Sequence, residues 1–249
     1  MRIAITNLFG NAGKTSLAAH LLSPRLADAP IFSVDEANTT VTKFGLAATN
    51  FKGDDFGEIY RAIMLLDKAV IDVGGSTNLY YFLNGMAAVE DAHDEIDAFL
   101  IPTVPNHDKC VDETIKTYKL LISSGVPKEK IHFVFNMVKA SAAAEFSPLI
   151  EALNTLGAQY KLESTLFESK LFNLLSIYEM TIENLLNDKR DFKALAIKET
   201  NPDKRDAYTN LRYAQKMAPK VKENLDNLFI SLFPAKEESG KKVKETANQ

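Results

Sequence analysis

The sequence predicts an α/β protein with a doubly wound, mostly parallel sheet flanked by helices and with long helices in its C-terminal part. Two observations predict this fold. Short apolar runs alternate with helix-like stretches over the first two-thirds of the 249 residues, and a Gly-rich loop directly follows the first run. Strands that alternate with helices are joined by right-handed crossovers, which place helices on both faces of a parallel sheet.

Five strands and five helices are expected in this first part. The strands are short and apolar, and Ala69–Val73 is apolar enough to be covered on both faces. The first helix should stop at Ser23-Pro24, because proline lacks a backbone N–H. The expected strands are Ile3–Thr6, Ile31–Val34, Ala69–Val73, Ala98–Ile101 and His132–Met137, and the expected helices are Lys14–Leu22, Phe56–Leu66, Leu79–Val89, Asp112–Ile122 and Pro148–Leu156.

The C-terminal third has a helical pattern instead. Leu171–Asn187 is helix-like with a break near Tyr178, and Pro202–Phe233 is predicted to form one long helix that Pro219 can kink. We expect a single domain over residues 1–233, with its helical part at about 170–233. Residues 234–249 are rich in lysine and glutamate, and a disordered tail is expected there.

Composition narrows the class of protein. The formal net charge of −4 gives no overall attraction to nucleic acid or to an anionic membrane, so such contacts would need a local patch. The single cysteine, Cys110, excludes an internal disulfide and suits a reducing compartment. No apolar stretch is long enough to span a membrane, and the first residues lack the pattern of a signal peptide. We therefore expect a cytoplasmic protein without membrane contact.

The histidines do not indicate a metal site. His20, His93, His107 and His132 have no metal-ligand spacing among themselves or with Cys110, and we interpret them as core or surface residues. No Ser/His/Asp or Cys/His arrangement for nucleophilic catalysis is evident either.

Residues 9–16, Phe-Gly-Asn-Ala-Gly-Lys-Thr-Ser, have the composition of a phosphate-binding loop. They separate an apolar strand from a helix start, where backbone N–H groups and the helix dipole favour an anion. Lys14 would reach the β- and γ-phosphates of a nucleotide, and the Thr15 hydroxyl would bind Mg²⁺. The alternative is a chance Gly-Lys-Thr at a helix start. The expected cofactor-binding residues here are Gly10, Asn11, Ala12, Gly13, Lys14, Thr15 and Ser16.

This loop departs from the common pattern Gly-x-x-x-x-Gly-Lys-Thr/Ser, because Leu8 occupies the position of the first glycine. The form Lys-Gly-Gly-x-Gly-Lys-Thr/Ser fits better, with Phe9 in place of the first lysine and Asn11 in place of a glycine. Asparagine is the non-glycine residue that best tolerates a positive φ, so the turn can survive this change.

Asp72 lies near the end of a second informative segment, Lys-Ala-Val-Ile-Asp-Val-Gly-Gly-Ser at 68–76. A carboxylate that ends a buried strand in this way can hold Mg²⁺ through its water shell. Gly74 and Gly75 would let the next turn bring an N–H toward a γ-phosphate. The alternative is an ordinary acidic turn. Ligands of parallel sheets bind beyond the carboxyl ends of the strands, so we expect this segment and the Gly-rich loop in one site.

Two further polar residues follow expected strands. Asp35 could orient or deprotonate an attacking water, or it could be an ordinary helix N-cap or turn residue. Asn136 has a planar amide that suits the edge of an adenine ring, or it could simply end its strand in a turn. Both would lie at the same edge of the sheet as the Gly-rich loop.

The set of motifs resembles the ParA/MinD-type P-loop ATPases, which position plasmids, chromosomes and division machinery. The resemblance covers about residues 1–180 and rests on Phe9–Ser16, Asp35–Asn38, 72–75 and 135–137. Within that family, the loop Gly-Asn-x-Gly-Lys is similar to the StbB-type plasmid-stability proteins.

The resemblance implies ATP and Mg²⁺ as ligands and slow hydrolysis. It also implies an ATP-dependent dimer that binds DNA without sequence preference, and a DNA-binding adaptor protein as partner. It gives Asp35 the catalytic-water role beside Lys14, Asp72 the Mg²⁺ role with Thr15, and Asn136 the adenine role. These are the expected catalytic, metal-binding and base-binding residues.

Phe9 is the main departure from the family pattern. The family's lysine at this position reaches the nucleotide of the partner subunit, and no basic residue stands between Ile3 and Gly13. Either another basic residue, such as Arg25 or Lys43, replaces it, or dimerisation through the nucleotide is weaker in this chain.

A cluster of basic residues on the long C-terminal helix is the candidate DNA contact. Solvated helix faces commonly have this composition, and nearby acidic residues dilute the positive charge. We therefore favour the interpretation of this cluster as an ordinary solvated helix face over a DNA contact. A true DNA-binding face would show steep salt dependence. The cluster comprises Lys204, Arg205, Arg212, Lys216, Lys220 and Lys222.

Two other functions fit the same scaffold. An ATP-dependent ligase or kinase for a small carboxylic acid should have basic residues near Asp35 to hold its acceptor. A scaffold that binds nucleotide without hydrolysis is the other alternative, suggested by Phe9. We expect a nucleotide-dependent switch in plasmid or DNA partition. ATP is favoured over GTP, because no guanine-reading Asn/Thr-Lys-x-Asp segment is evident.

Overall fold

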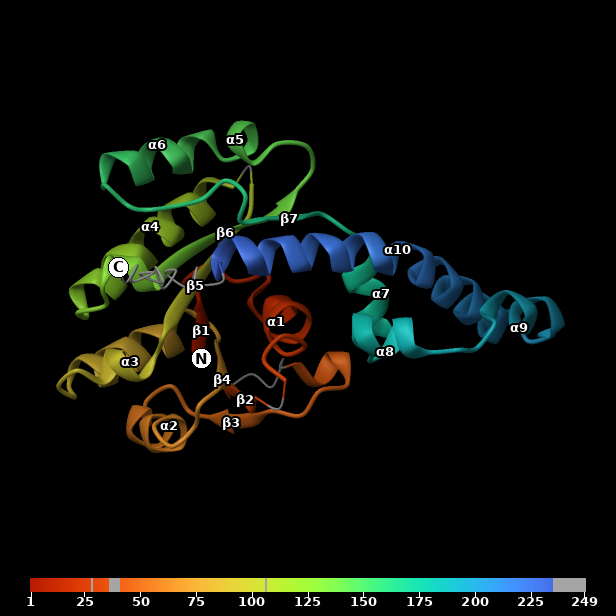
Figure 1. Cartoon of the computed structure of the whole chain (residues 1–249), viewed down its shortest axis with the longest axis horizontal. Helices are drawn as coiled ribbons and strands as arrows, with labels where there is room; N and C mark the ends of the chain where they lie inside the picture. The colour runs from red at the N-terminus through yellow and green to blue at the C-terminus, as the bar shows by residue number, and fades with distance from the viewer. Residues whose placement is uncertain (28, 36–40, 106, 235–249) are drawn as a thin grey trace, which may run out of the picture.

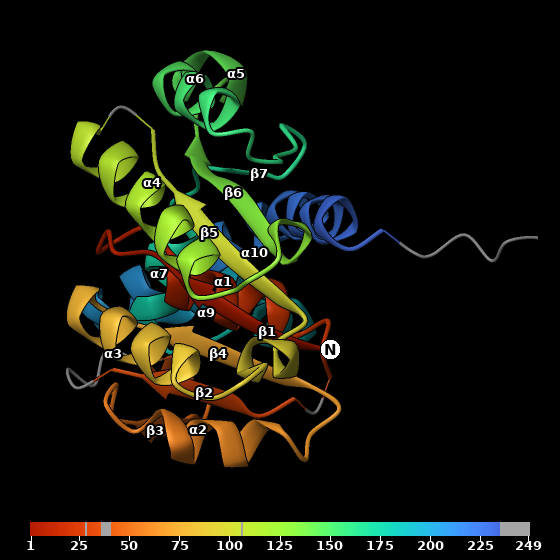
Figure 2. The ribbon, with the colours of Figure 1, turned by 90° about the vertical axis from the view of Figure 1, so that its left-hand side faces the viewer.

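The computed structural model describes residues 1–27, 29–35, 41–105 and 107–234, and all but the first residue of the expected tail lies outside these ranges. Its centre is a seven-stranded sheet in the order β3-β2-β4-β1-β5-β6-β7, with every pair parallel (Figures 1 and 2). The strands are β1 (Arg2–Thr6), β2 (Ile31–Val34), β3 (Thr49–Phe51), β4 (Ala69–Val73), β5 (Ala98–Thr103), β6 (Ile131–Val138) and β7 (Thr165–Phe167). The predicted fold class is confirmed.

Helices cover both faces of the sheet because successive strand residues point to opposite sides. Ala4 of β1 belongs to one core, while Ile3 and Ile5 belong to the other. The first core is covered by α2 (Phe56–Ile63), α3 (Ser76–Ala87), α4 (Asp108–Ser123), α5 (Ala142–Glu145) and α6 (Ser147–Thr155). The second is covered by α1 (Lys14–Leu17), α7 (Leu171–Ile177), α8 (Ile182–Asn187), α9 (Phe192–Lys198) and α10 (Pro202–Leu232).

The first helix differs from its prediction. Only Lys14–Leu17 is α-helical, and Ala18–Leu22 continues as a π-helix, whose wide turn is closed by the Ser23 N–H donating to the Ala18 carbonyl at 3.0 Å. The apolar pattern of the sequence does not distinguish an α-helix from a π-helix here, because both would bury the same apolar residues. The π-helix places the His20 ring against Phe44 and Phe172, with ring centroids 4.4 and 5.4 Å apart.

Helices α7, α8 and α10 follow the sequence pattern, whereas α9 was not predicted. The break expected near Tyr178 separates α7 from α8, and α10 runs unbroken through Pro219 for 31 residues. The N-terminal part of α10 and α9 extend together away from the sheet (Figure 1). Among the described helices, none combines the length and apolar character that crossing a bilayer requires.

Candidate nucleotide-binding site

The loop between β1 and α1 has the backbone of a phosphate cradle. Asn11 has a φ of 58° and Gly13 a φ of 92°, so both adopt the left-handed conformation that the sequence predicted Asn11 would tolerate. A Cβ at Gly13 would lie 2.3 Å from Nδ2 of Asn136, so this position also needs glycine for space. The loop is therefore held in a strained shape against the end of β6.

Asn7 fixes the start of this loop. Its Nδ2 donates to the Pro102 carbonyl at 2.7 Å and to the Thr114 hydroxyl at 3.0 Å, and its Oδ1 accepts from the Phe9 N–H at 2.8 Å. These bonds join the loop to β5 and α4. Sequence reasoning missed Asn7, because its partners are about a hundred residues away along the chain.

Lys14 is buried beneath the loop. Its Nζ donates to the carbonyls of Asn7 and Phe9 at 3.0 and 3.1 Å. Burial lowers the pKa of Lys14, and the negative charges of Asp72 and Asp35 act against that effect. Among the described residues this desolvated ammonium has only backbone carbonyls as acceptors, so it gains strongly from a phosphate oxygen, which can replace either carbonyl.

Asp72 lies in β4, next to Ile5 of β1 and Ser33 of β2 in register. It is 4% exposed, and its Oδ1 has no hydrogen-bond partner among the described residues. Burial raises the pKa of Asp72, while a hydrogen bond from the Thr15 hydroxyl and the charge of Lys14 act in the opposite direction. An orphaned carboxylate oxygen beside a threonine hydroxyl is a donor set that fits Mg²⁺.

Asp35 reaches the same place from the end of β2. Its carboxylate lies over Gly74, where an added Cβ would be 2.6 Å from Oδ2, and Asn78 Nδ2 donates to its Oδ1 at 3.4 Å. Gly75, with a φ of 56°, starts α3 at this point. Sequence reasoning missed Asn78, whose only signal is its place on the helix that follows the two glycines.

Asn136 is 5% exposed and already has partners. Its Nδ2 donates to the Ala12 carbonyl at 2.8 Å, and its Oδ1 accepts from the N–H of Met137 at 2.9 Å. In this arrangement the amide braces the phosphate-binding loop. Its predicted adenine role remains a prediction.

Several of these groups line one cavity of about 500 Å³. Ala12, Asp72 and Asn136 are buried and do not line it. Lys43 was named from sequence only as one of two substitutes for the missing lysine, and Met137 and Asn173 were not assigned to the site. The lining residues are Gly10, Asn11, Gly13, Lys14, Thr15, Ser16, Asp35, Lys43, Gly74, Gly75, Met137 and Asn173.

Phe9 and Arg25 do not line this cavity. The Phe9 ring packs edge-on against His107, with centroids 4.7 Å apart. Arg25 donates to the carbonyls of His20 and Leu21 and pairs with Asp226 of α10 at 2.5 Å. Of the two candidate replacements for the missing lysine, the structure therefore brings only Lys43 to the site.

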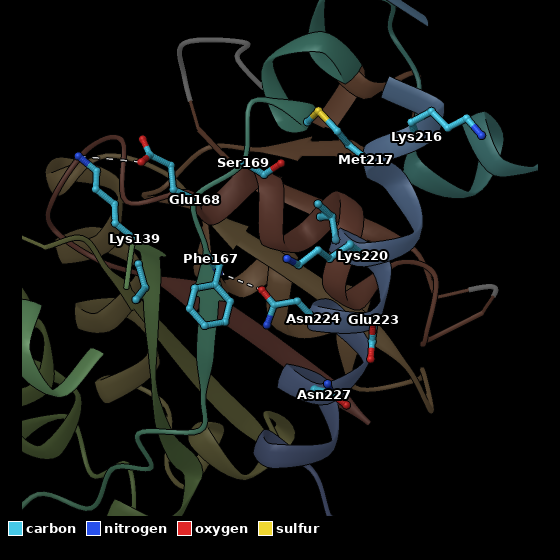
Figure 3. Close-up of a pocket in the computed structure, with 12 residues that line it drawn as sticks. Lys139, Phe167, Glu168, Ser169, Lys216, Met217, Lys220, Glu223, Asn224 and Asn227 are labelled. Carbon is cyan, nitrogen blue, oxygen red and sulfur yellow. Dashed lines mark hydrogen bonds and ion pairs between the residues drawn. The ribbon is translucent and has the colours of Figure 1, made fainter. Parts of the chain in front are cut away.

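A larger groove of about 910 Å³ lies between β7 and α10 (Figure 3). Two members of the basic cluster, Lys216 and Lys220, line it, but it contains no residue of the phosphate-binding loop. Asn224 holds one wall, since its Oδ1 accepts from the Phe167 N–H at 2.9 Å. The smaller cavity is the better candidate site, because charged and strained groups converge there.

Residues Asp91, His93 and Asp94 could also place ligand atoms within 4.8 Å of one another, a cluster that the spacing of the histidines did not indicate. Lys130 already donates to Asp94 at 2.9 Å and to the His93 carbonyl at 3.2 Å. This exposed cluster is therefore part of an ion-pair network.

No protein-family model matches the chain, and a search of curated proteins finds no match. Similar solved structures include the ATP complex of Cyanothece McdA, with 14% identity over 86% of this chain and 96% of that one and a TM-score of 0.48. The cell-division protein MinD of Aquifex aeolicus has 13% identity, covers 87% of this chain and 97% of its own, and has a TM-score of 0.46. The strand order and the loop after β1 are those of the P-loop NTPase fold.

Proposed function

We propose that this chain binds Mg·ATP, hydrolyses it slowly and acts as a nucleotide-dependent switch of the ParA/MinD type in plasmid or DNA partition. One observation carries the nucleotide part of the proposal: the buried Asp72 oxygen without a partner lies beside Thr15, under a loop that buries Lys14. A charge arrangement of this kind costs stability unless a ligand completes it.

In the proposed complex, the loop N–H groups and Lys14 hold the phosphates, and Thr15 and Asp72 hold the metal. Bound Mg²⁺ neutralises charge on the β- and γ-phosphates. Asp35, kept in place by Asn78 and lying over Gly74, orients the attacking water. The adenine role of Asn136 requires that its amide leave the Ala12 carbonyl or share it.

The switch function rests on the motif resemblance together with the position of two loops. The turn after Asp72 and the carboxylate of Asp35 meet at Gly74, so a γ-phosphate placed there would contact both. Contacts of this kind order neighbouring segments and change partner binding in P-loop switches. The proposed partners are a second copy of the chain, a DNA-binding adaptor protein and duplex DNA bound without sequence preference.

The test is ATP turnover with and without duplex DNA, measured for the wild type, Lys14→Ala and the control Lys68→Ala. We expect wild-type turnover well below the range of about 1–100 s⁻¹ typical of kinases. DNA should stimulate it, and Lys14→Ala should lower it by at least about 100-fold, the usual cost of removing one transition-state donor. Lys68 is exposed just before the amino end of β4, whereas the cavity lies at the carboxyl ends of the strands, so its substitution should leave turnover unchanged. Unchanged turnover in Lys14→Ala would contradict the proposal.

One observation favours a second candidate, the small-acid kinase or ligase. Lys43 lines the cavity together with Asp35, as an acceptor-binding cation would. This function requires transfer of phosphate to an added carboxylic acid at a rate that depends on the acid. Measurement of acceptor-dependent ADP release across a panel of small carboxylic acids distinguishes it from the switch.

A further inference from the structure

The cavity contains two cations among the residues that line it, Lys14 and Lys43. They reach it from different elements. Lys14 starts α1 and is buried, with its Nζ bonded to two loop carbonyls. Lys43 belongs to the 3-10 helix Val41–Phe44, which follows β2, and its side chain is exposed toward the cavity. No described carboxylate forms an ion pair with Lys43.

The backbone around Lys43 is fixed by packing on both sides. Val41 and Phe44 are each 1% exposed, and the Phe44 ring packs edge-on against His20 of the π-helix. The Lys43 ammonium lies 5.1 Å from the centre of the Phe44 ring, within cation–π range. The base of the lysine is therefore anchored to the helix that leaves the phosphate-binding loop.

The next residue anchors the segment to a second element. Gly45 has a φ of 72°, and a Cβ there would lie 2.4 Å from the carbonyl oxygen of Glu179, in the turn between α7 and α8. With both ends of the segment packed, little backbone entropy remains to be lost when Lys43 meets a ligand. The backbone of Lys43 is therefore preorganised by the fold.

Lys43 lines the cavity together with Thr15, Asp35 and Gly74. The Asp35 carboxylate lies over Gly74, where an added Cβ would be 2.6 Å from its Oδ2. The terminal phosphate of the proposed complex is expected at this turn, and Lys43 borders the same cavity.

We propose that Lys43 is a second phosphate-binding cation, supplied by the same chain, which contacts the terminal phosphate of ATP and stabilises the charge that develops there during hydrolysis. This inference rests on the proposed nucleotide-binding function. A cation in this position, supplied in cis or in trans, contributes about 10³–10⁵-fold to phosphoryl transfer in P-loop proteins. A site completed in cis does not need a second copy of the chain for turnover.

The test compares Lys43→Ala and Lys43→Arg with the control Lys52→Ala, an exposed lysine on the loop between β3 and α2. Lys43→Ala should lower kcat by about 10³-fold or more, since that is the lower end of the effect of such a cation. Its affinity for Mg·ADP should stay within about twofold, because ADP lacks the phosphate that Lys43 contacts. Lys43→Arg should recover much of kcat, since the charge is retained. Wild-type kcat per chain should not change with protein concentration.

Failure of the proposed function and failure of the proposed role of Lys43 give different results in this experiment. If the wild type neither binds nor hydrolyses Mg·ATP, the proposed function fails and this inference with it. If the wild type hydrolyses ATP and Lys43→Ala behaves as Lys52→Ala does, the proposed function stands and the role of Lys43 is wrong. Equal loss of Mg·ADP and Mg·ATP affinity in Lys43→Ala, or a kcat that rises with protein concentration, would also overturn the inference.

Discussion

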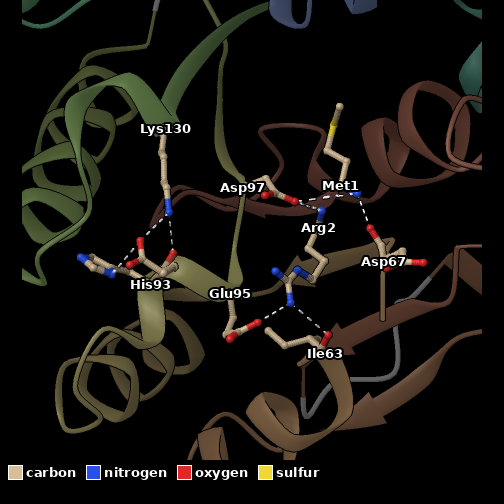
Figure 4. A network of polar contacts seen from close by, with 9 residues as sticks. Met1, Arg2, Ile63, Asp67, His93, Glu95, Asp97 and Lys130 are labelled. Atoms are coloured by element: carbon tan, nitrogen blue, oxygen red, sulfur yellow. Dashed lines mark hydrogen bonds and ion pairs between the residues drawn. The ribbon is translucent and has the colours of Figure 1, made fainter. Parts of the chain in front are cut away.

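Charged side chains are paired at the amino ends of the strands and incompletely paired at the carboxyl ends. At the amino ends, one network, called the amino-end network, pairs its charges: Arg2 with Glu95, the N-terminal ammonium with Asp97, and Lys130 with Asp94 (Figure 4). At the carboxyl ends, Asp72 keeps a buried oxygen without a described partner, and among the described residues Lys14 donates hydrogen bonds only to carbonyls.

This difference in pairing distinguishes charges that stabilise the fold from charges that a ligand would complete. The amino-end network is largely satisfied within the protein and needs no ligand. The carboxyl end combines burial, incomplete pairing and a positive φ at the non-glycine residue Asn11, each of which costs free energy in the absence of a ligand. Incomplete charge pairing at the carboxyl ends of the strands is therefore a better guide to the functional site than the number of charged residues at either end.

The largest expected effect is at His20, behind the phosphate-binding loop. His20 is fully buried, and burial, followed by the charge of Lys43, lowers its pKa to about 3. A histidine whose folded pKa lies below its unfolded value of 6.5 costs stability as the pH falls from 6.5 through about 3. The loss near pH 3 is on the order of 5 kcal/mol.

Urea unfolding at several pH values measures this effect, with His20→Leu as comparison. Leucine has a similar volume and no proton to take up, so the difference between the two proteins should grow as the pH falls. Parallel pH profiles for wild type and His20→Leu would show that His20 does not set the acid limit.

Gly13→Ala should both strain the backbone at residue 13 and abolish the binding of Mg·ATP. Its φ of 92° and the 2.3 Å approach to Asn136 predict a destabilisation of about 1–3 kcal/mol. Mg·ATP binding should be lost, because the cradle must shift. Gly10→Ala is the matched control: an added Cβ there meets nothing within 4 Å. Calorimetric titration of both variants checks this, and equal affinities would argue against a cradle.

Asp72→Asn should raise the stability of the ligand-free protein by about 1–3 kcal/mol at neutral pH, because it removes a buried charge that Thr15 and Lys14 compensate only in part. The gain should vanish on acidification. The folded pKa of Asp72 is raised, so its carboxyl costs nothing below the unfolded pKa and costs more as the pH rises through the folded value. Melting curves with and without Mg·ATP should show the variant losing the stabilisation by ligand. A variant less stable than the wild type at neutral pH would break the contrast between the two ends.

The smallest effect belongs to the amino-end network. Arg2 and Glu95 have partly exposed side chains, with 19% and 28% exposure, so their coupling should be about 0.5–1 kcal/mol. A double-mutant cycle with Arg2→Ala and Glu95→Ala measures it. ATP turnover should be unchanged in all three variants, and a change would mean that the network is not purely structural.

The central part of the fold was predictable from the sequence because its signals are local. All five expected strands are present, since continuous apolar runs mark strands covered on both faces. Strands β3 and β7 were missed because each has three residues, too few for any periodicity. Helix α9 was missed as well, because seven residues between polar turns give a weak pattern.

The candidate site was predictable only where its motifs are continuous. The loop at 10–16 and Asp72 carry their signal in neighbouring residues. The contact of Asn78 with Asp35 spans 43 residues, and the brace from Asn136 to Ala12 spans 124. Lys43 gave no more than a guess, because its approach to the cavity depends on how Phe44 and Gly45 pack against other elements.

Helix α10 has a mechanical consequence. Its 31 residues give a rod of about 46 Å. One half of this rod rests on β7 and α7, while the other half and α9 overhang the body of the protein. A tilt of about 5° where the support ends would swing the overhanging tip by roughly 2 Å, because the overhanging half is about 23 Å long at this rise per residue. The overhang therefore amplifies any small repacking near α7, and fluorescent labels at its tip would detect such motion before labels placed elsewhere.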